Sequence, residues 1–141
     1  MGRILGVDYG TRRIGIALSD PLQITAQPYG AWTGVRDASL IGRFVALVRQ
    51  EGVERVVVGH PLTLKGTASR FCGAVERFAG SLSASCPVPV VLWDERLTSV
   101  QAHRVMHEMG KRPGREKPSV DVLAAALMLQ SYLDSVNRPR T

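Results

Sequence analysis

The sequence is poor in cysteine, which limits the metal and redox sites that it can form. Only Cys72 and Cys86 occur among its 141 residues, and they do not form a CxxC pair. No cluster of histidines completes a zinc-binding pattern with them. We therefore expect no metal held by thiolates, and we expect both cysteines to be reduced residues with a structural role.

The sequence also lacks a long apolar run and an internal repeat. No segment approaches the length that a membrane span requires, and the residues up to Asp8 do not have the apolar core and cleavage site of a signal peptide. We expect a cytoplasmic protein. No linker divides the chain, so residues 1–136 are expected to form one domain, followed by a short disordered tail at 137–141.

Acidic residues are outnumbered by basic ones. The chain has 18 Lys and Arg against 12 Asp and Glu, a net charge of +6, which favours a polyanionic partner such as nucleic acid. Four basic residues fall in the Gly- and Pro-rich segment Gly110 to Pro118, although a solvated loop would have the same composition. The basic residues that we expect to contact nucleic acid are Arg12, Arg13, Arg96, Lys111, Arg112, Arg115 and Lys117.

The spacing of apolar residues predicts an α/β fold. Strands are expected at residues 3–9, 14–18, 23–32, 54–59 and 88–93, and helices at 37–50, 69–82, 98–109 and 120–135. The first three strands should form an antiparallel meander, with Pro28 confining the third to a sheet edge. Right-handed crossovers then place the fourth strand beside the first. We predict a five-stranded mixed sheet of order 3-2-1-4-5 with helices on both faces.

Asp8 is an acid within the strand predicted to be central. A buried carboxylate is costly unless it is paired, hydrogen-bonded or bound to a cation. Asp8 shares a strand face with Gly6, and Gly10 follows, so these small residues are expected to leave room for a ligand beside the carboxylate. The alternative is that backbone amides of the hairpin turn, Arg12 or Arg13 satisfy the charge.

Two further acids, Asp94 and Glu95, come directly after the last predicted strand. Successive strand residues point to opposite faces, so only one of them can easily face Asp8. We favour Glu95 because its side chain reaches further, while Asp94 stays a candidate. The alternative makes Asp94 a turn residue and pairs Glu95 with Arg96 or Arg12.

Asp121 lies in the first turn of the last predicted helix, where the helix dipole favours any acid. It shares a helix face with Ala124, Ala125 and Met128, a stripe of residues that should pack on the sheet. An acid on such a stripe is expected to point toward other polar groups. We therefore expect Asp121 to approach the carboxyl ends of the central strands.

Three carboxylates that converge in this way would repel one another unless cations lay between them. Oxygen ligands suit Mg²⁺ or Mn²⁺, and two such ions about 4 Å apart can activate a water and stabilise the leaving oxygen in phosphodiester hydrolysis. His60 follows the fourth predicted strand and is a possible proton carrier. A histidine before a proline, here Pro61, is also common as a structural residue.

Four segments of the sequence resemble the YqgF (RuvX) family of pre-16S rRNA nucleases and Holliday junction resolvase homologues. They are GVDYGTRRIGIALSD (6–20), GHPLTLKG (59–66), DERLTS (94–99) and KPSVDVLAAALMLQSYL (117–133). The resemblance implies a ribonuclease H-like fold, a divalent metal and a role in 5′ maturation of the small-subunit ribosomal RNA precursor. Resolution of branched DNA junctions is the alternative that it implies.

The resemblance also assigns residues. Asp8 and Asp121 match the first and last acids of the family, and Glu95 or Asp94 has to supply the middle ligand, because Gly59, His60 and Pro61 occupy the place of an acid found in related resolvases. A monomer or a homodimer would be compatible with these roles. Two other classes stay open: a kinase-like domain whose glycine-containing turn cradles a phosphate, and a ribosome-assembly factor that binds RNA without cutting it.

Overall fold

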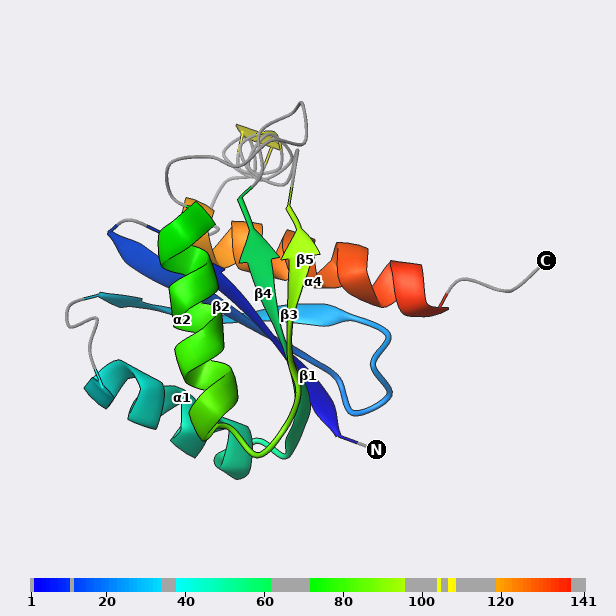
Figure 1. The fold of residues 1–141 in the computed structure, drawn as a ribbon. Coiled ribbons are helices and arrows are strands. Elements are labelled where there is room, and N and C mark those ends of the chain that lie inside the picture. The colour runs from blue at the N-terminus through cyan, green and yellow to red at the C-terminus, as the bar shows by residue number, and fades with distance from the viewer. Residues whose placement is uncertain are drawn as a thin grey trace.

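A five-stranded mixed sheet forms the centre of the fold (Figure 1). The computed structural model describes residues 2–10, 12–33, 38–61, 72–95, 104, 107–108 and 119–137. The elements are β1 (Arg3–Tyr9), β2 (Arg13–Ser19), β3 (Ala26–Thr33), α1 (Ala38–Gln50), β4 (Val53–His60), α2 (Cys72–Ser85), β5 (Val90–Asp94) and α4 (Val120–Asn137).

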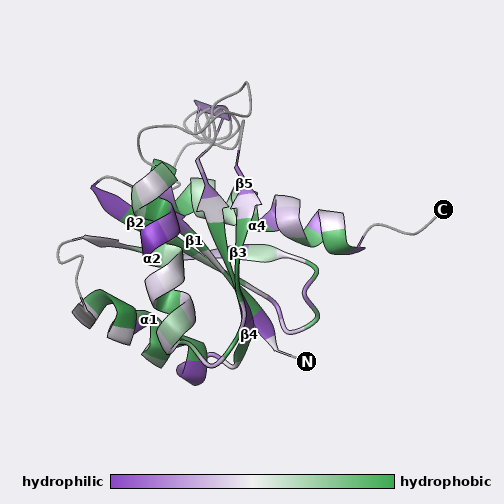
Figure 2. Cartoon of the chain, viewed as in Figure 1, coloured by the Kyte–Doolittle hydropathy of each residue, from purple (hydrophilic) through white to green (hydrophobic). Residues whose placement is uncertain are grey.

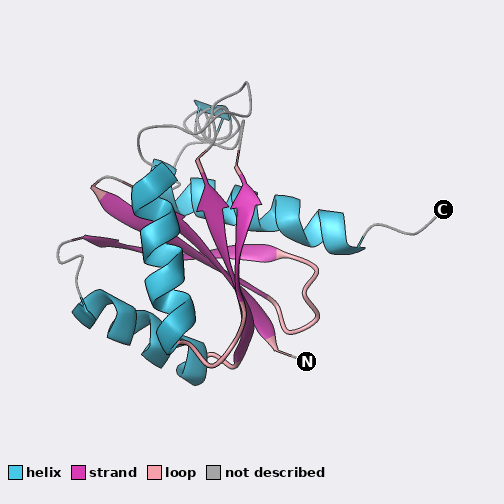
Figure 3. Ribbon diagram, in the orientation of Figure 1, coloured by secondary structure: helices cyan, strands magenta, loops and turns pink. Residues whose placement is uncertain are grey.

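The strand order is β3-β2-β1-β4-β5, as predicted. β1 pairs antiparallel with β2 and parallel with β4, and β4 pairs parallel with β5 (Figure 3). The carboxyl ends of β1, β4 and β5 therefore lie at the same edge of the sheet. Both Asp8 and Asp94 lie at or near this edge, because they stand at or next to the last residues of their strands.

Helices cover both faces of the sheet, which confirms that part of the prediction. α1 and α2 lie on one face and α4 lies on the other (Figure 1), and Figure 2 shows hydrophobic residues gathered in the strands and the helices that cover them. Strand residues alternate between the two cores. One core, on the α1 and α2 side, includes Leu5, Val7, Ile16, Phe44, Val58 and Leu82. The other, on the α4 side, includes Ile4, Ala17, Val57, Met128, Leu129 and Leu133.

Most boundaries of the described elements lie within two residues of the sequence prediction, but the start of β3 and the end of α2 differ by three. β3 begins at Ala26 rather than at residue 23, because the preceding residues form a turn around Asp20, whose Oδ1 accepts hydrogen bonds from the amides of Ile24 (2.7 Å) and Thr25 (2.8 Å). α2 ends at Ser85 rather than at residue 82. Pro87 follows shortly, and the residue before a proline is biased away from helical geometry.

A short disordered tail was predicted to begin at residue 137. Asn137 is the last residue of α4, and its side-chain amide donates a hydrogen bond to the Gln23 carbonyl at 2.7 Å. Residues 138–141 lie outside the described residues.

Of the predicted helix at 98–109, the structure describes only Arg104, His107 and Glu108, all of them helical. Among the described helices, none is both long and apolar enough to cross a membrane.

Candidate active site

Asp8 and Glu95 come together on the face of the sheet that α4 covers. Asp8 pairs in register with Gly15 of β2. Gly59 of β4 supports Glu95, because a Cβ placed on Gly59 would lie only 2.9 Å from the Glu95 Cδ, and closer still to its carboxylate oxygen. Glu95 thus occupies the space that a side chain at position 59 would fill, and its carboxyl group reaches the central strand.

The carboxyl groups of Asp8 and Glu95 share a hydrogen bond in a buried setting. Burial is the largest cause that raises the pKa of Asp8, from 3.8 to about 6, and the nearby charge of Asp121 raises it further, while the hydrogen bond with Glu95 lowers it. Burial, and then the charge of Asp8, raise the pKa of Glu95 from 4.5 to about 8. Near neutral pH the pair therefore holds a proton, which the two carboxyl groups share in their hydrogen bond.

Asp121 completes the group of acids from the first turn of α4. A Cβ on Gly15 would lie 2.6 Å from the Asp121 carbonyl carbon, so the glycine allows the helix backbone to lie directly on β2. The Asp121 Oδ1 lies 3.6 Å from the position of a Cβ on Gly10, just beyond β1. Ser119 caps the helix by accepting a hydrogen bond from the Val122 amide at 3.3 Å. The structure thus brings Asp8, Glu95 and Asp121 together.

Asp94 lies on the other face of the sheet. Val91 and Trp93 pack against the core beneath α4, whereas Val90 packs against the core beneath α1 and α2. By the alternation of strand residues, Asp94 belongs with Val90, and it pairs in register with His60 of β4. The geometry therefore favours Glu95 over Asp94 as the acid that faces Asp8.

The stripe of α4 residues predicted to pack on the sheet does so in large part. Ala125 and Met128 are fully buried against the strands, while Ala124 belongs to a small separate cluster with Leu123. The expectation that Gly6 leaves room for a ligand is wrong, since a Cβ there would lie 2.9 Å from the Cβ of Leu129. Gly6 serves the close packing of α4 on the sheet.

The structure places some of the basic residues that were expected to bind nucleic acid, and it places His60, the candidate proton carrier. Arg12 and Arg13 are exposed at the start of β2, next to the turn that follows Asp8, and the Arg13 carbonyl accepts a hydrogen bond from the Gly10 amide at 3.0 Å. The His60 side chain contacts Glu76 of α2, with 3.0 Å between the His60 Nε2 and the Glu76 Oε1. Five other basic candidates lie outside the described residues: Arg96, Lys111, Arg112, Arg115 and Lys117.

Two residues that shape the site were not identified from the sequence. Gly15 admits the α4 backbone and Gly59 admits the Glu95 side chain. The available signal was a glycine inside a strand, which often marks the close approach of another group. A single sequence does not say which group approaches.

The sequence is similar to those of known proteins over nearly its whole length. Residues 2–135 match the family model RuvX, described as Holliday junction resolvase. A candidate pre-16S rRNA nuclease of Syntrophus aciditrophicus is 43% identical over 138 residues, which cover 98% of this chain and 92% of that protein. One of Lachnospira eligens is 40% identical over 136 residues, covering 94% and 97%.

Solved structures of resolvases share the architecture. RuvC of Thermus thermophilus in complex with a Holliday junction substrate aligns with a TM-score of 0.54 at 16% identity, covering 96% of each chain. The Holliday junction resolvase of fowlpox virus aligns with a TM-score of 0.55 at 14% identity, covering 94% of this chain and 99% of that one. At these identities the likeness concerns the fold, and it confirms the predicted ribonuclease H-like class.

Proposed function

This chain belongs to the RuvX family, and from that membership we propose that it is a metal-dependent nuclease. It hydrolyses phosphodiester bonds, with Asp8, Glu95 and Asp121 as its catalytic acids. The observation that carries the proposal is the buried hydrogen-bonded pair of Asp8 and Glu95, with Asp121 close enough to raise the pKa of Asp8. Acids gathered in this way at the edge of a sheet are typical of a catalytic site.

The donor set fits a divalent cation. Three carboxylates offer hard oxygen ligands, and the proton shared by Asp8 and Glu95 occupies a position where a positive charge is favoured. Mg²⁺ or Mn²⁺ held by Asp8, Glu95 and Asp121 would supply Lewis-acid stabilisation of phosphate charge and a more acidic water. These ions are the proposed cofactors, and Asp94 is not needed as a ligand.

The protein groups have separate tasks in this proposal. Glu95 has to release its proton when it becomes a ligand, so its raised pKa should make metal binding weaker as the pH falls. Asp8 stands in the central strand, and the absence of a side chain at Gly15 and Gly59 lets the other two acids approach it. Arg12 and Arg13, both exposed, are proposed to bind phosphate oxygens of the substrate beside the acids.

The proposed substrate is nucleic acid, first of all the precursor of the small-subunit ribosomal RNA at its 5′ end. The names of the relatives support this choice, and a cytoplasmic location forms part of it. The second candidate is resolution of Holliday junctions, which the family description favours. Resolution requires paired cuts on a two-fold substrate, so a homodimer would support it and a strict monomer would oppose it.

The test is a titration of Mg²⁺ and Mn²⁺ with matched substrates: a precursor RNA fragment, linear DNA and a four-way junction. Asp8→Asn keeps the shape of the side chain and should lower cleavage by at least about 100-fold, because it removes a direct ligand. Asp94→Asn is the matched control, since Asp94 lies on the other face, and it should retain most activity.

The outcomes separate the functions. RNA cut in preference to both DNAs supports the ribosomal role, whereas symmetric cuts in the junction favour the resolvase. Cleavage that Asp8→Asn leaves undiminished would overturn the site. RNA binding without any metal-dependent cleavage would overturn the enzyme proposal and favour a non-catalytic assembly factor.

A further inference from the structure

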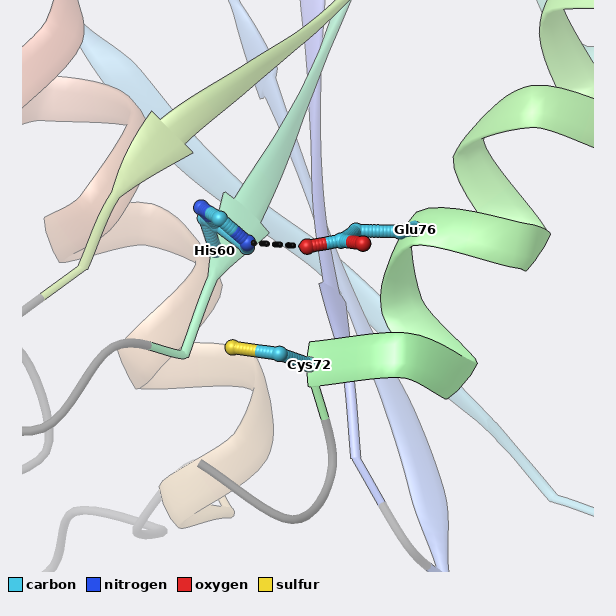
Figure 4. Close-up of side chains that lie close together, drawn as sticks. All are labelled: His60, Cys72 and Glu76. Carbon is cyan, nitrogen blue, oxygen red and sulfur yellow. Dashed lines mark hydrogen bonds and ion pairs between the residues drawn. The ribbon is translucent and has the colours of Figure 1, made fainter. Parts of the chain in front are cut away.

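A second group of side chains of the types that bind metals lies where β4 meets α2 (Figure 4). His60 is the last residue of β4, and Cys72 and Glu76 come from the first turns of α2. One donor atom from each of the three lies within 4.8 Å of the others. His60 alternates with Val58, which packs on the α1 and α2 side, so this group lies on the opposite face of the sheet from Asp8 and Glu95.

The fold explains why these three side chains meet. Cys72 and Glu76 are four residues apart on a helix and therefore share one of its faces. The His60 Nε2 lies 3.0 Å from the Glu76 Oε1, and the Cys72 thiol is buried, with its Sγ 3.4 Å from the Pro61 carbonyl oxygen. All three side chains point toward one another in Figure 4. Sequence spacing gave no sign of a thiolate-held metal, because the fold, not the local sequence, brings His60 to Cys72.

We propose that His60, Cys72 and Glu76 bind Zn²⁺. Imidazole nitrogen, thiolate sulfur and carboxylate oxygen are the three ligand types that zinc uses, and their bond lengths put donors about 3.5 Å apart in a tetrahedron. The His60 and Glu76 donors lie 3.0 Å apart and all three donors lie within 4.8 Å of one another, a range that includes this value. His60 and Glu76 have side chains that are 22% and 53% exposed, which leaves access for the ion and for a water as fourth ligand.

The proposed zinc site differs in chemistry from the three acids. Sulfur and imidazole ligands favour Zn²⁺, whereas the all-carboxylate set of Asp8, Glu95 and Asp121 favours Mg²⁺ or Mn²⁺, so the two faces should select different ions. The two sites share a strand end. The His60 carbonyl accepts a hydrogen bond from the Glu95 amide at 3.3 Å, so an ion on the His60 side chain would also restrain the backbone that holds Glu95.

An ordinary hydrogen bond between His60 and Glu76 beside a buried cysteine is the alternative, and it predicts no bond to sulfur. Co²⁺ distinguishes the two, because a cobalt–thiolate bond gives a near-ultraviolet charge-transfer band. The reduced, metal-free full-length protein should bind one Co²⁺ with this band, and added Zn²⁺ should remove it. Cys72→Ser should abolish the band, while the control Cys86→Ser, at the second cysteine of the chain, should keep it.

Further variants make the test independent of folding and of the nuclease proposal. Glu76→Gln, on an exposed position, should weaken Co²⁺ binding at least about tenfold while circular dichroism stays unchanged. Asp8→Asn should leave the band intact even where cleavage is lost. Absence of the band in the wild-type protein, its persistence in Cys72→Ser, or unchanged affinity in Glu76→Gln would each overturn the zinc site.

Discussion

Replacing Glu95 with glutamine would remove one ionisable group from the buried pair that it forms with Asp8. Glutamine has the same length and keeps an N–H donor for the Asp8 carboxylate, so the hydrogen bond can persist without the second acid. The pKa of Glu95 is raised to about 8 from 4.5, first by burial and then by the charge of Asp8. Ionised Glu95 therefore destabilises the metal-free fold, and Glu95→Gln should relieve that cost.

The sign and size of the effect follow from the pKa values. Because the folded-state pKa lies above the unfolded value, the stability linked to Glu95 is fully present below 4.5 and is lost as the pH rises through about 8. Each pH unit within this window lowers the free energy of unfolding by up to about 1.4 kcal/mol. Between about pH 5 and about pH 7, the wild-type protein should lose about 2 to 3 kcal/mol relative to Glu95→Gln.

Urea denaturation in the presence of a chelator, repeated at several pH values, measures this difference. Asp8 titrates in both proteins, so the comparison reports mainly on Glu95. Glu76→Gln is the control, because it removes a carboxylate that is 53% exposed and should change stability little at any pH. Parallel stability curves for wild type and Glu95→Gln across the pH range would refute the buried acid pair.

Three further predictions concern the pH dependence of metal binding, the space at Gly59 and the buried hydrogen bond of Ser19. The affinity for Mn²⁺, measured by calorimetry, should rise about tenfold per pH unit up to about pH 8 and then level off, because Glu95 must lose its proton to bind. Gly59→Ala should weaken Mn²⁺ binding at the acids by about tenfold, because its Cβ would lie 2.9 Å from the Glu95 Cδ and the Glu95 carboxyl group would have to move, whereas Gly30→Ala has open space and should leave binding unchanged. Ser19→Ala should lower the free energy of unfolding by about 1 to 3 kcal/mol in urea denaturation, because the buried Oγ accepts a hydrogen bond from the Ile4 amide at 2.8 Å.

The sheet was predictable because its signals are local or follow from chain topology. The uninterrupted apolar run in β4 indicates a strand covered on both faces, and Val57 and Val58 indeed pack against different cores. The start of β3 was not predictable to the residue. The turn at Asp20 could be expected, but the reach of its carboxylate to the amides of Ile24 and Thr25 depends on the folded geometry.

The choice between Asp94 and Glu95 shows what the sequence of a buried strand leaves open. An amphipathic strand reveals its inner face by its polarity, but β5 is apolar on both, so its sequence alone does not tell which side faces α4. The packing of Trp93 beneath α4, against Tyr132 at 5.4 Å between ring centroids, decides it and turns Glu95 toward Asp8.

The same alternation has a second consequence at the ends of β4 and β5. It separates Gly59, which leaves space for Glu95, from its neighbour His60, which faces α2. One residue step along β4 thus separates the face that holds Glu95 from the face where His60 meets Cys72 and Glu76 of α2. Because both donor sets depend on the same strand ends, a change that shifts β4 should disturb both, whereas a change in α2 should disturb only the proposed zinc site.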